Sequence, residues 1–222
     1  SYKNALMQRL LTGKQRFPEF AGTKWEKHAF KEIFTPHKDL NSNNLNYEVL
    51  SVTKDGIVSQ SQYFNKEVAS EDKSAYLIVK RDTLVMSGLN FWMGSIDFQK
   101  VCDIGIVSPA YKAFQVNKKT YDIDFLKHFV RSEIMRRVLI GASVQGASIV
   151  RRNLDSDMLM DSVISLPNTQ EQQKIAAILN AADKEINLLN QKLDAYKEQK
   201  KGLMQQLLTG KKRVKLSQSE AA

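Results

Sequence analysis

The chain has 222 residues, of which 42% are hydrophobic and 26% are charged. This composition is ordinary for a globular protein and suits one good-sized domain, or one domain plus an extended helix. The formal net charge of +9 favours a polyanionic partner such as nucleic acid, because Lys and Arg neutralise phosphates.

Targeting and redox features are few. The sequence has no apolar run long enough to cross a bilayer, and the first residues lack the apolar stretch and cleavage site of a signal peptide. We therefore expect a cytoplasmic protein that does not contact a membrane. Cys102 is the only cysteine, which excludes an internal disulfide and a thiolate zinc cluster, and we interpret it as a buried thiol.

A segment near the start of the chain returns near its end. Residues 3–16 and 200–213 are identical at ten of fourteen positions, at a constant offset. Each copy contains Leu-Leu-Thr-Gly-Lys, which is typical of a helix closed by a left-handed glycine, with basic residues near the last carbonyls. The repeat predicts one globular unit framed by two helix ends.

Short strands are predicted between residues 24 and 117, after Pro and Gly in 17–23 break the first helix. Residues 48–53 and 57–59, joined by Lys54-Asp55-Gly56, read as a hairpin. Further strand candidates, separated by Gly, Asp or Pro, are 76–79, 83–86, 93–98, 105–108 and 112–116. This region is therefore expected to be mainly β.

Helical periodicity replaces alternation after residue 123. Apolar residues recur at helical spacing from Asp124 to Leu139 and predict one helix. Gly141, Gly146 and the polar residues between them predict a loop. An apolar element from Met158 to Leu166 follows, and Pro167 closes the domain.

The last part of the chain predicts one long helix. Thr169 and Gln172 have the spacing of a capping box, and nothing from Gln170 to Leu208 breaks a helix except the tolerated Gly202. About 39 residues at 1.5 Å each span roughly 58 Å.

A seam of residues runs along this helix at alternating steps of four and three, and all of them except Lys200 are apolar. The seam consists of Ile175, Leu179, Ala182, Ile186, Leu189, Leu193, Tyr196, Lys200, Leu203 and Leu207. It predicts pairing with a second helix. The alternative is a surface helix that packs on its own domain.

These features together resemble the specificity subunit of type I restriction-modification enzymes. The resemblance rests on Leu166-Pro167, the following Glu171-Gln172-Gln173-Lys174-Ile175-Ala176, and a coiled-coil helix that finishes in Leu207-Leu208-Thr209-Gly210-Lys211. Gly105-Ile106-Val107-Ser108-Pro109-Ala110-Tyr111 and Gln145-Gly146 also match signatures of that family's target recognition domain.

The resemblance implies an α+β fold, with a mainly β target recognition domain followed by a conserved coiled-coil helix. It divides the chain into the end of a preceding helix (1–16), the recognition domain (17–167), the spacer helix (168–213) and a flexible tail (214–222). A complete subunit has two such domains, each reading one half of a bipartite double-stranded DNA target. The paired helices also hold methyltransferase subunits, and restriction subunits join the assembly.

Only one recognition domain is present in this sequence. We interpret the chain as the second half of a two-domain subunit, because residues 3–16 resemble the tail of a preceding conserved helix. The alternative is a half-subunit that dimerises. The second coiled-coil helix would come from the rest of the subunit in the first case and from a homodimer mate in the second.

Catalytic motifs are missing. The sequence has no phosphate-binding Gly-x4-Gly-Lys loop and no Asn-Pro-Pro-aromatic motif, and His28, His37 and His128 lack metal-ligand spacing. We therefore expect neither enzymatic activity nor a cofactor nor a metal site. A coiled-coil adaptor whose head binds protein is the alternative function.

DNA readout needs amides and basic side chains in loops, and four segments provide them. They are 37–44, alternatively a flexible linker; 59–66, alternatively an edge strand; 87–92, alternatively core; and 143–153. The predicted DNA-binding residues are Lys38, Asn41, Asn43, Asn44, Ser59, Gln60, Gln62, Tyr63, Asn90, Trp92, Ser143, Gln145, Gly146, Arg151 and Arg152. Arg136 and Arg137 are added as contacts to phosphate or, alternatively, to the helix surface.

Overall fold

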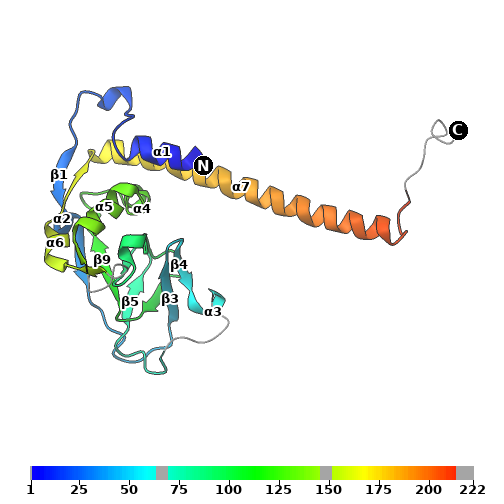
Figure 1. The fold of residues 1–222 in the computed structure, drawn as a ribbon, viewed down its shortest axis with the longest axis horizontal. Coiled ribbons are helices and arrows are strands. Elements are labelled where there is room, and N and C mark those ends of the chain that lie inside the picture. The colour runs from blue at the N-terminus through cyan, green and yellow to red at the C-terminus, as the bar shows by residue number, and fades with distance from the viewer. Residues whose placement is uncertain (1, 64–69, 146–151, 214–222) are drawn as a thin grey trace. The chain divides into compact units, whose positions relative to one another are not determined.

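The structure is a computed structural model that describes residues 2–63, 70–145 and 152–213 (Figure 1). The described helices are α1 (Tyr2–Leu10), α2 (Phe30–Ile33), α3 (Gln60–Tyr63), α4 (Ile123–Phe129), α5 (Glu133–Gly141), α6 (Ser156–Asp161) and α7 (Thr169–Leu208), with 3₁₀ turns η1 (Pro18–Phe20) and η2 (Phe91–Met93). The described strands are β1 (Glu26–Ala29), β2 (Phe34–His37), β3 (Glu48–Thr53), β4 (Gly56–Ser59), β5 (Leu77–Lys80), β6 (Leu84–Ser87), β7 (Ile96–Phe98), β8 (Ile104–Val107), β9 (Tyr111–Val116), β10 (Ser143–Gln145), β11 (Arg152–Leu154) and β12 (Val163–Leu166).

Two four-stranded sheets form the framework of the globular part. Their strand orders are β4-β3-β8-β5 and β2-β9-β6-β7. All neighbouring strands are antiparallel except β3 and β8, which run parallel. Two further pairs, β1 with β12 and β10 with β11, are short antiparallel ribbons. The expected α+β class, mainly β before a long C-terminal helix, is confirmed.

The predicted hairpin is confirmed. Strands β3 and β4 pair antiparallel from Leu50–Ser59 to Thr53–Gly56. Gly56 has a φ of 128°, and a Cβ there would lie 2.7 Å from a carboxylate oxygen of Asp97. Glycine is therefore required at this bend for both its backbone conformation and its lack of a side chain.

The strand predicted at 93–98 starts later than expected. Residues 91–93 form η2, and Gly94 ends this turn in the left-handed region with a φ of 92°. Strand β7 therefore begins only at Ile96. The other predicted strands agree with β5, β6, β8 and β9 to within a residue at each end.

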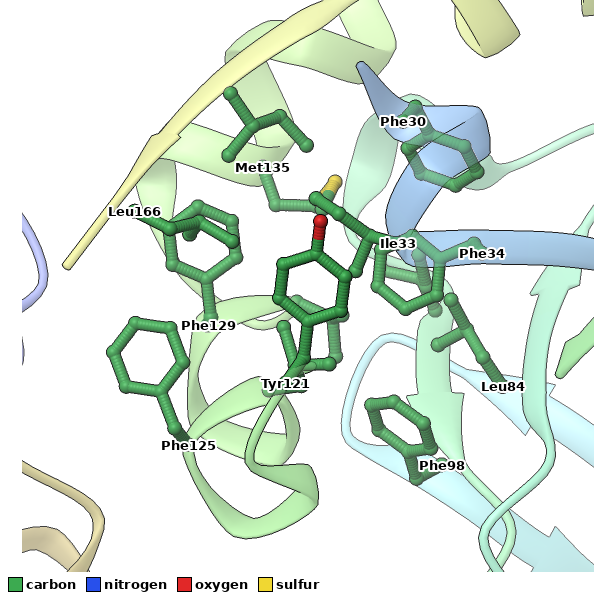
Figure 2. Close-up of a cluster of buried hydrophobic side chains, with 14 of the residues drawn as sticks. Phe30, Ile33, Phe34, Leu84, Phe98, Tyr121, Phe125, Phe129, Met135 and Leu166 are labelled. Carbon is green, nitrogen blue, oxygen red and sulfur yellow. The ribbon is translucent and has the colours of Figure 1, made fainter. Parts of the chain in front are cut away.

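Alternation along β6 separates two cores. Leu84 and Met86 face the larger cluster, where the sheet β2-β9-β6-β7 meets the helices, whereas Val85 faces a smaller cluster. The smaller cluster also contains Leu50 and Val107 from the other sheet, so it lies between the two sheets. Figure 2 shows part of the larger cluster, with aromatic side chains such as Phe30, Phe98 and Phe129 and aliphatic ones such as Leu84 and Leu166. Because successive side chains of a strand point to opposite faces of the sheet, β6 contributes both to the core beneath the helices and to the core between the two sheets.

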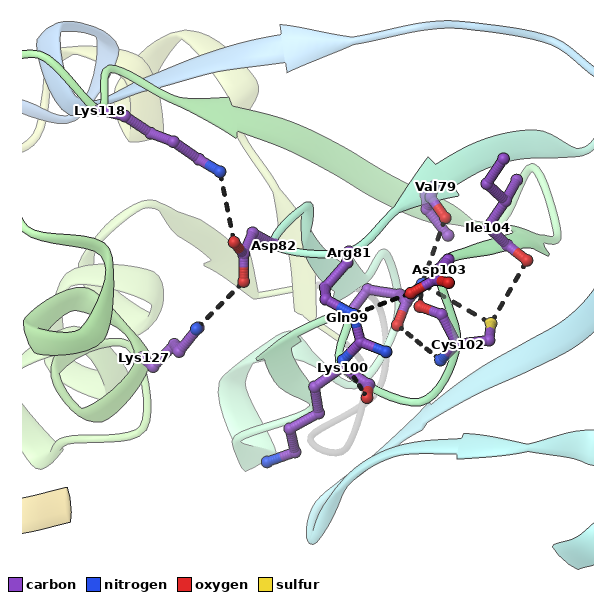
Figure 3. A network of polar contacts seen from close by, with 10 residues as sticks. All are labelled: Val79, Arg81, Asp82, Gln99, Lys100, Cys102, Asp103, Ile104, Lys118 and Lys127. Atoms are coloured by element: carbon purple, nitrogen blue, oxygen red, sulfur yellow. Dashed lines mark hydrogen bonds and ion pairs between the residues drawn. The ribbon is translucent and has the colours of Figure 1, made fainter. Parts of the chain in front are cut away.

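A polar network fixes the turn between β5 and β6 (Figure 3). Asp82 has a φ of 69°, and its carboxylate forms ion pairs with Lys118 at 3.3 Å and with Lys127 at 3.1 Å. Buried Gln99 donates its side-chain amide to the carbonyl of Cys102 at 2.7 Å. Lys118, Lys127 and Cys102 therefore help to stabilise this turn.

The single helix predicted from Asp124 to Leu139 is wrong. Two helices, α4 and α5, replace it, because Ser132 adopts an extended conformation and accepts a hydrogen bond from the backbone N–H of Met135. Asp122 caps α4 in the same way through Phe125. The apolar spacing continues across the break, so periodicity alone did not reveal two caps.

Two predictions near residue 166 are also corrected. The apolar element expected at 158–166 is a short helix, α6, followed by strand β12, which pairs with β1. The capping box is wrong, since Asn168 caps α7 by accepting from the N–H of Glu171. Gln172 instead accepts from the N–H of Asp122 and donates to the carbonyl of Pro167, which ties the start of α7 to the domain.

The predicted long helix is confirmed as α7, which is 40 residues long. The chain forms two compact units, and their boundary falls after Leu179. Ile175 and Leu179 were predicted to pair with a second helix, but both are buried in the core of the first unit. These first turns of α7 therefore pack on the chain's own domain, which was the alternative. No helix among the described residues is long and apolar enough to cross a membrane.

The remaining seam lies in the second unit. Ala182 is half-buried, and the large apolar seam residues are exposed by 38% to 67%. These exposed residues are Ile186, Leu189, Leu193, Tyr196, Leu203 and Leu207. An exposed apolar stripe of this length is typical of a helix that packs against another surface.

Candidate nucleic-acid interface

The first two predicted segments lie at opposite edges of the sheet β4-β3-β8-β5, because Leu40 pairs with Leu77 of β5 and Ser59 ends β4. Glu48, at the start of β3, accepts hydrogen bonds from the hydroxyls of Ser59 and Ser61, which follow on β4 and α3. Asn44 accepts from the N–H of Lys73, which precedes β5. Lys38 and Asn43 of the first segment, and Gln62 and Tyr63 of the second, are exposed.

Several predicted residues in this region support the fold instead. Asn41 is only 1% exposed, and its side chain bonds to both the N–H and the carbonyl of Leu45. Ser59 is buried, and Gln60 donates to the hydroxyl of Ser51 at 2.7 Å. The side chain of Asn41 is therefore not accessible to DNA in this structure. Asn44 has a φ of 49°, which an Asn tolerates at a tight turn.

The third and fourth segments both adjoin α5. Turn η2 packs against α5, and the hairpin β10–β11 follows α5 directly along the chain. Arg152 donates to the hydroxyl of Ser143 at 3.0 Å, which joins the two strands of the hairpin. Gly146 and Arg151 lie outside the described residues, and only the backbone of Gln145 is described.

Basic side chains lie around η2 and α5. A cavity of about 210 Å³ is lined by Lys54, Arg131 and Arg136 together with Met93 and Gly94 at the end of η2. Arg137, the next residue of α5, has a side chain that is 79% exposed. We call Lys54, Arg131, Arg136 and Arg137 the basic α5 surface.

One carboxylate organises the arginines of α5. Glu133 accepts two hydrogen bonds from Arg136, at 2.7 and 2.6 Å, and lies 3.6 Å from Arg137. The hydrogen bond from Arg136 lowers the pKa of the Glu133 carboxyl, so it stays ionised. Glu133, Arg136 and Arg137 are spaced at i,i+3 and i,i+4, so these ion pairs could have been predicted from the sequence.

Arg131 is held differently. It donates to Asp97 at 3.2 Å and to the carbonyl of Lys54 at 3.2 Å. Asp97 is 2% exposed, so this ion pair anchors the base of the surface. Sequence reasoning missed Lys54, Arg131 and Asp97, because their meeting depends on a hairpin turn, a helix break and a strand that are far apart in the chain.

Two predicted residues, Asn90 and Trp92, lie at η2. Trp92 is half-buried and packs against the larger cluster, and its indole N–H has no hydrogen-bond partner among the described residues. Asn90 is exposed, and its N–H is held by the hydroxyl of Ser87 at 3.1 Å. Trp92 thus serves mainly as core, whereas Asn90 is accessible.

Across the described ranges, no group of three or more His, Cys, Asp or Glu side chains is placed to hold a metal ion. The arrangement offers hydrogen-bond donors, amides and positive charge, which can bind and orient a polyanion.

Comparison with known families identifies the chain's relatives. The family described as type I restriction modification DNA specificity domain matches residues 23–197. This match covers well over half of the chain, and the chain belongs to that family.

Solved structures agree on the fold. The chain is similar to the HsdS subunit from Thermoanaerobacter tengcongensis, with a TM-score of 0.56 and 14% identity over 83% of this chain and 48% of that one. It is also similar to the type I restriction-modification S subunit from M. genitalium, with a TM-score of 0.52 and 12% identity over 91% and 52% of the two chains. A structure on complex assembly and conformational transition of the type I R-M system gives a TM-score of 0.55 at 14% identity, over 88% and 52%. These identities support likeness of fold alone, and the chain spans about half the length of the structures it matches.

Proposed function

We propose that this chain is a non-catalytic specificity subunit, or half of one, that recognises one half of a bipartite double-stranded DNA target. The observation that carries the proposal is the basic α5 surface beside the hairpin β10–β11 and η2, in a chain of the DNA specificity family. Such a protein acts in the cytoplasm. Family membership disfavours the adaptor alternative.

The exposed side chains fall into two groups, one suited to phosphate and one suited to base edges. Arg137 and Lys54 are exposed cations, which suit phosphate, because a point charge or a guanidinium neutralises phosphate without reading sequence. Asn90, Asn43 and Gln62 carry exposed amides, which suit base edges in the major groove. Gln145 remains a predicted base contact and Arg151 a predicted phosphate contact.

The exposed seam of α7 supports the partner part of the proposal. We propose that it pairs with a second conserved helix and that methyltransferase and restriction subunits assemble on the pair. The recognition domain would then choose the DNA, and the partner subunits would supply the catalysis. This division follows from the absence of catalytic motifs in the sequence.

Substitutions in the assembled enzyme test the proposal. We expect Arg137→Ala to weaken binding to all DNA sequences alike and to reduce the slope of log affinity against log salt by about one. Gln62→Ala, Asn90→Ala and Gln145→Ala should each relax the preference at one base. The measurements are DNA-binding titrations at several salt concentrations and mapping of methylated sites.

Lys24→Ala is the matched control for charge, because Lys24 is exposed and outside all four segments. It should leave the salt slope unchanged. If Arg137→Ala behaves like Lys24→Ala and none of the amide substitutions alters the methylated sequence, the assignment of this interface is wrong.

A further inference from the structure

An exposed carboxylate lies within the basic α5 surface. Glu133 lines the same cavity as Lys54, Arg131 and Arg136, and it is the one acidic side chain among the described residues that line this cavity. Its side chain is 45% exposed. A carboxylate repels the phosphates of DNA, so on a DNA-binding surface it lowers affinity unless it also makes a compensating contact.

The carboxylate of Glu133 is held in place by an arginine. Arg136 donates from Nε to Oε2 at 2.7 Å and from Nη2 to Oε1 at 2.6 Å. The Nε atom of Arg137 lies 3.6 Å from Oε1. A two-point contact with a planar guanidinium sets both the position and the plane of the carboxylate. Glu133 therefore needs little further ordering when it binds a ligand.

Glu133 can offer DNA only hydrogen-bond acceptors. The hydrogen bond from Arg136 lowers the pKa of the Glu133 carboxyl, so the group is ionised at neutral pH and cannot donate. An ionised carboxylate has about four lone-pair positions, and Arg136 occupies only part of them. The charged ends of Lys54, Arg136 and Arg137 are all donors, so the acceptor sites of Glu133 give this surface a second kind of chemistry.

The groups that surround this acceptor share the exposed face of α5. Met135 and Leu139 are buried, whereas Glu133, Arg136 and Arg137 are exposed. A helix fits the major groove of DNA, where phosphates flank the base edges.

Amino groups are the donors that bases present in the major groove. Cytosine offers its N4 amino group, and a carboxylate is the side-chain group that accepts from it. Adenine also offers an amino group, but its N7 acceptor lies beside that group and repels a carboxylate. A fixed carboxylate therefore suits cytosine better than any other base.

We propose that Glu133 is a specificity-determining residue that accepts a hydrogen bond from the N4 amino group of one cytosine in the recognised half-site. This inference rests on the proposed function and names a residue that reads a base. Arg136 holds the carboxylate, while the other edge of its guanidinium and Arg137 contact the neighbouring phosphates. The cytosine contact offsets the repulsion between Glu133 and phosphate. Sequences without that cytosine keep the repulsion alone and are disfavoured.

Mapping of methylated sites with the assembled enzyme carrying Glu133→Gln gives the first test. An amide both donates and accepts, so we expect the preference at one C·G pair to relax while the other positions stay unchanged. Affinity for unrelated DNA should rise about threefold, because one negative charge is removed. Glu26→Gln, at an exposed residue of β1, removes the same charge from another element and should change neither result.

Removing the amino group from the DNA tests the contact itself. The analogue 2-pyrimidinone is cytosine without its 4-amino group. Placed at the cytosine found by mapping, it should weaken binding of the unmodified enzyme about tenfold. The enzyme carrying Glu133→Ala should bind the two DNAs with equal affinity, because it has no carboxylate to lose the contact.

These measurements separate the cytosine contact from the proposed function. If Arg137→Ala weakens binding to all DNA but Glu133→Gln leaves the methylated sequence unchanged, the contact is wrong and the interface stands. Relaxation at an A·T pair would overturn the choice of cytosine. An equal loss with 2-pyrimidinone for the unmodified enzyme and for Glu133→Ala would show that Glu133 does not touch the amino group.

Discussion

At the scale of single residues, the polar side chains that matter most for the fold are those with partners far away in the chain. Asn41 closes a loop around Leu45 and Lys73, and Arg16 reaches buried Glu171. Asp82 combines a left-handed backbone with two lysine partners. Each of these residues looks like an ordinary surface residue in the sequence.

Asp82 predicts a pH dependence of stability. Burial raises the pKa of its carboxyl, but hydrogen bonds from Lys127 and Lys118 lower it by more, so the net pKa is below its ordinary value. A lowered pKa in the folded state stabilises the protein above the unfolded value of about 3.9, and this contribution is lost as the pH falls through the folded value.

We expect Asp82→Asn to lower the free energy of unfolding by about 1 kcal/mol at pH 7, with the difference disappearing below pH 4. Asn tolerates the positive φ, so the backbone is not strained. Urea unfolding followed by tryptophan fluorescence, at pH values from 7 to 3, measures the effect. Asp103→Asn, at a carboxylate that is 93% exposed, should change little, and an equal loss for both variants would contradict the assignment.

At the scale of secondary-structure elements, caps decided where helices begin. Ser132 separates α4 from α5 and directs Arg136 and Arg137 away from the axis that one continuous helix would have given them. Asn168 begins α7, and Gln172 anchors its first turn. The position of Arg136 and Arg137 within the basic α5 surface therefore depends on a single cap.

Ser132→Ala tests this dependence. Losing the side-chain acceptor for the Met135 N–H should lower the free energy of unfolding by about 1 kcal/mol. It should also weaken DNA binding more than the stability loss explains, because α5 carries the basic surface. Ser165→Ala on exposed β12 is the control and should leave both urea unfolding and DNA binding unchanged. An unchanged unfolding midpoint for Ser132→Ala would contradict the capping role.

At the scale of the whole molecule, α7 belongs to both compact units of the chain. Its first turns are part of the globular core, and its remaining seam is exposed. Under the proposed function, the length of the exposed helix sets the separation of the two DNA half-sites.

Deleting residues 184–190 tests that relation. The deletion removes one heptad and keeps the seam in phase, while shortening the helix by about 10 Å. At 3.4 Å per base pair, we expect the spacer between the two methylated half-sites to shrink by about three base pairs. Methylation mapping with the assembled enzyme measures the spacer. Lys184→Ala should leave it unchanged, and an unchanged spacer after the deletion would refute the relation.

The sequence by itself determined the features that depend on neighbouring residues. Alternation predicted the strands, Asp55-Gly56 predicted the hairpin, and a seam of threes and fours predicted α7. The repeat of 3–16 in 200–213 is likewise a property of the amino-acid sequence alone. The predicted elements are local, because hydrogen bonds within a helix and the side-chain periods of helices and strands span only a few residues.

Only the tertiary structure decided which residues are buried and which polar segments meet. Ile175 and Leu179 have the same spacing as Leu189 and Leu193, yet only the first pair is covered by the globular part. Asn41 and Asn43 are both loop asparagines, and only Asn41 is enclosed. Burial depends on contacts between residues far apart in the chain, which no local pattern encodes.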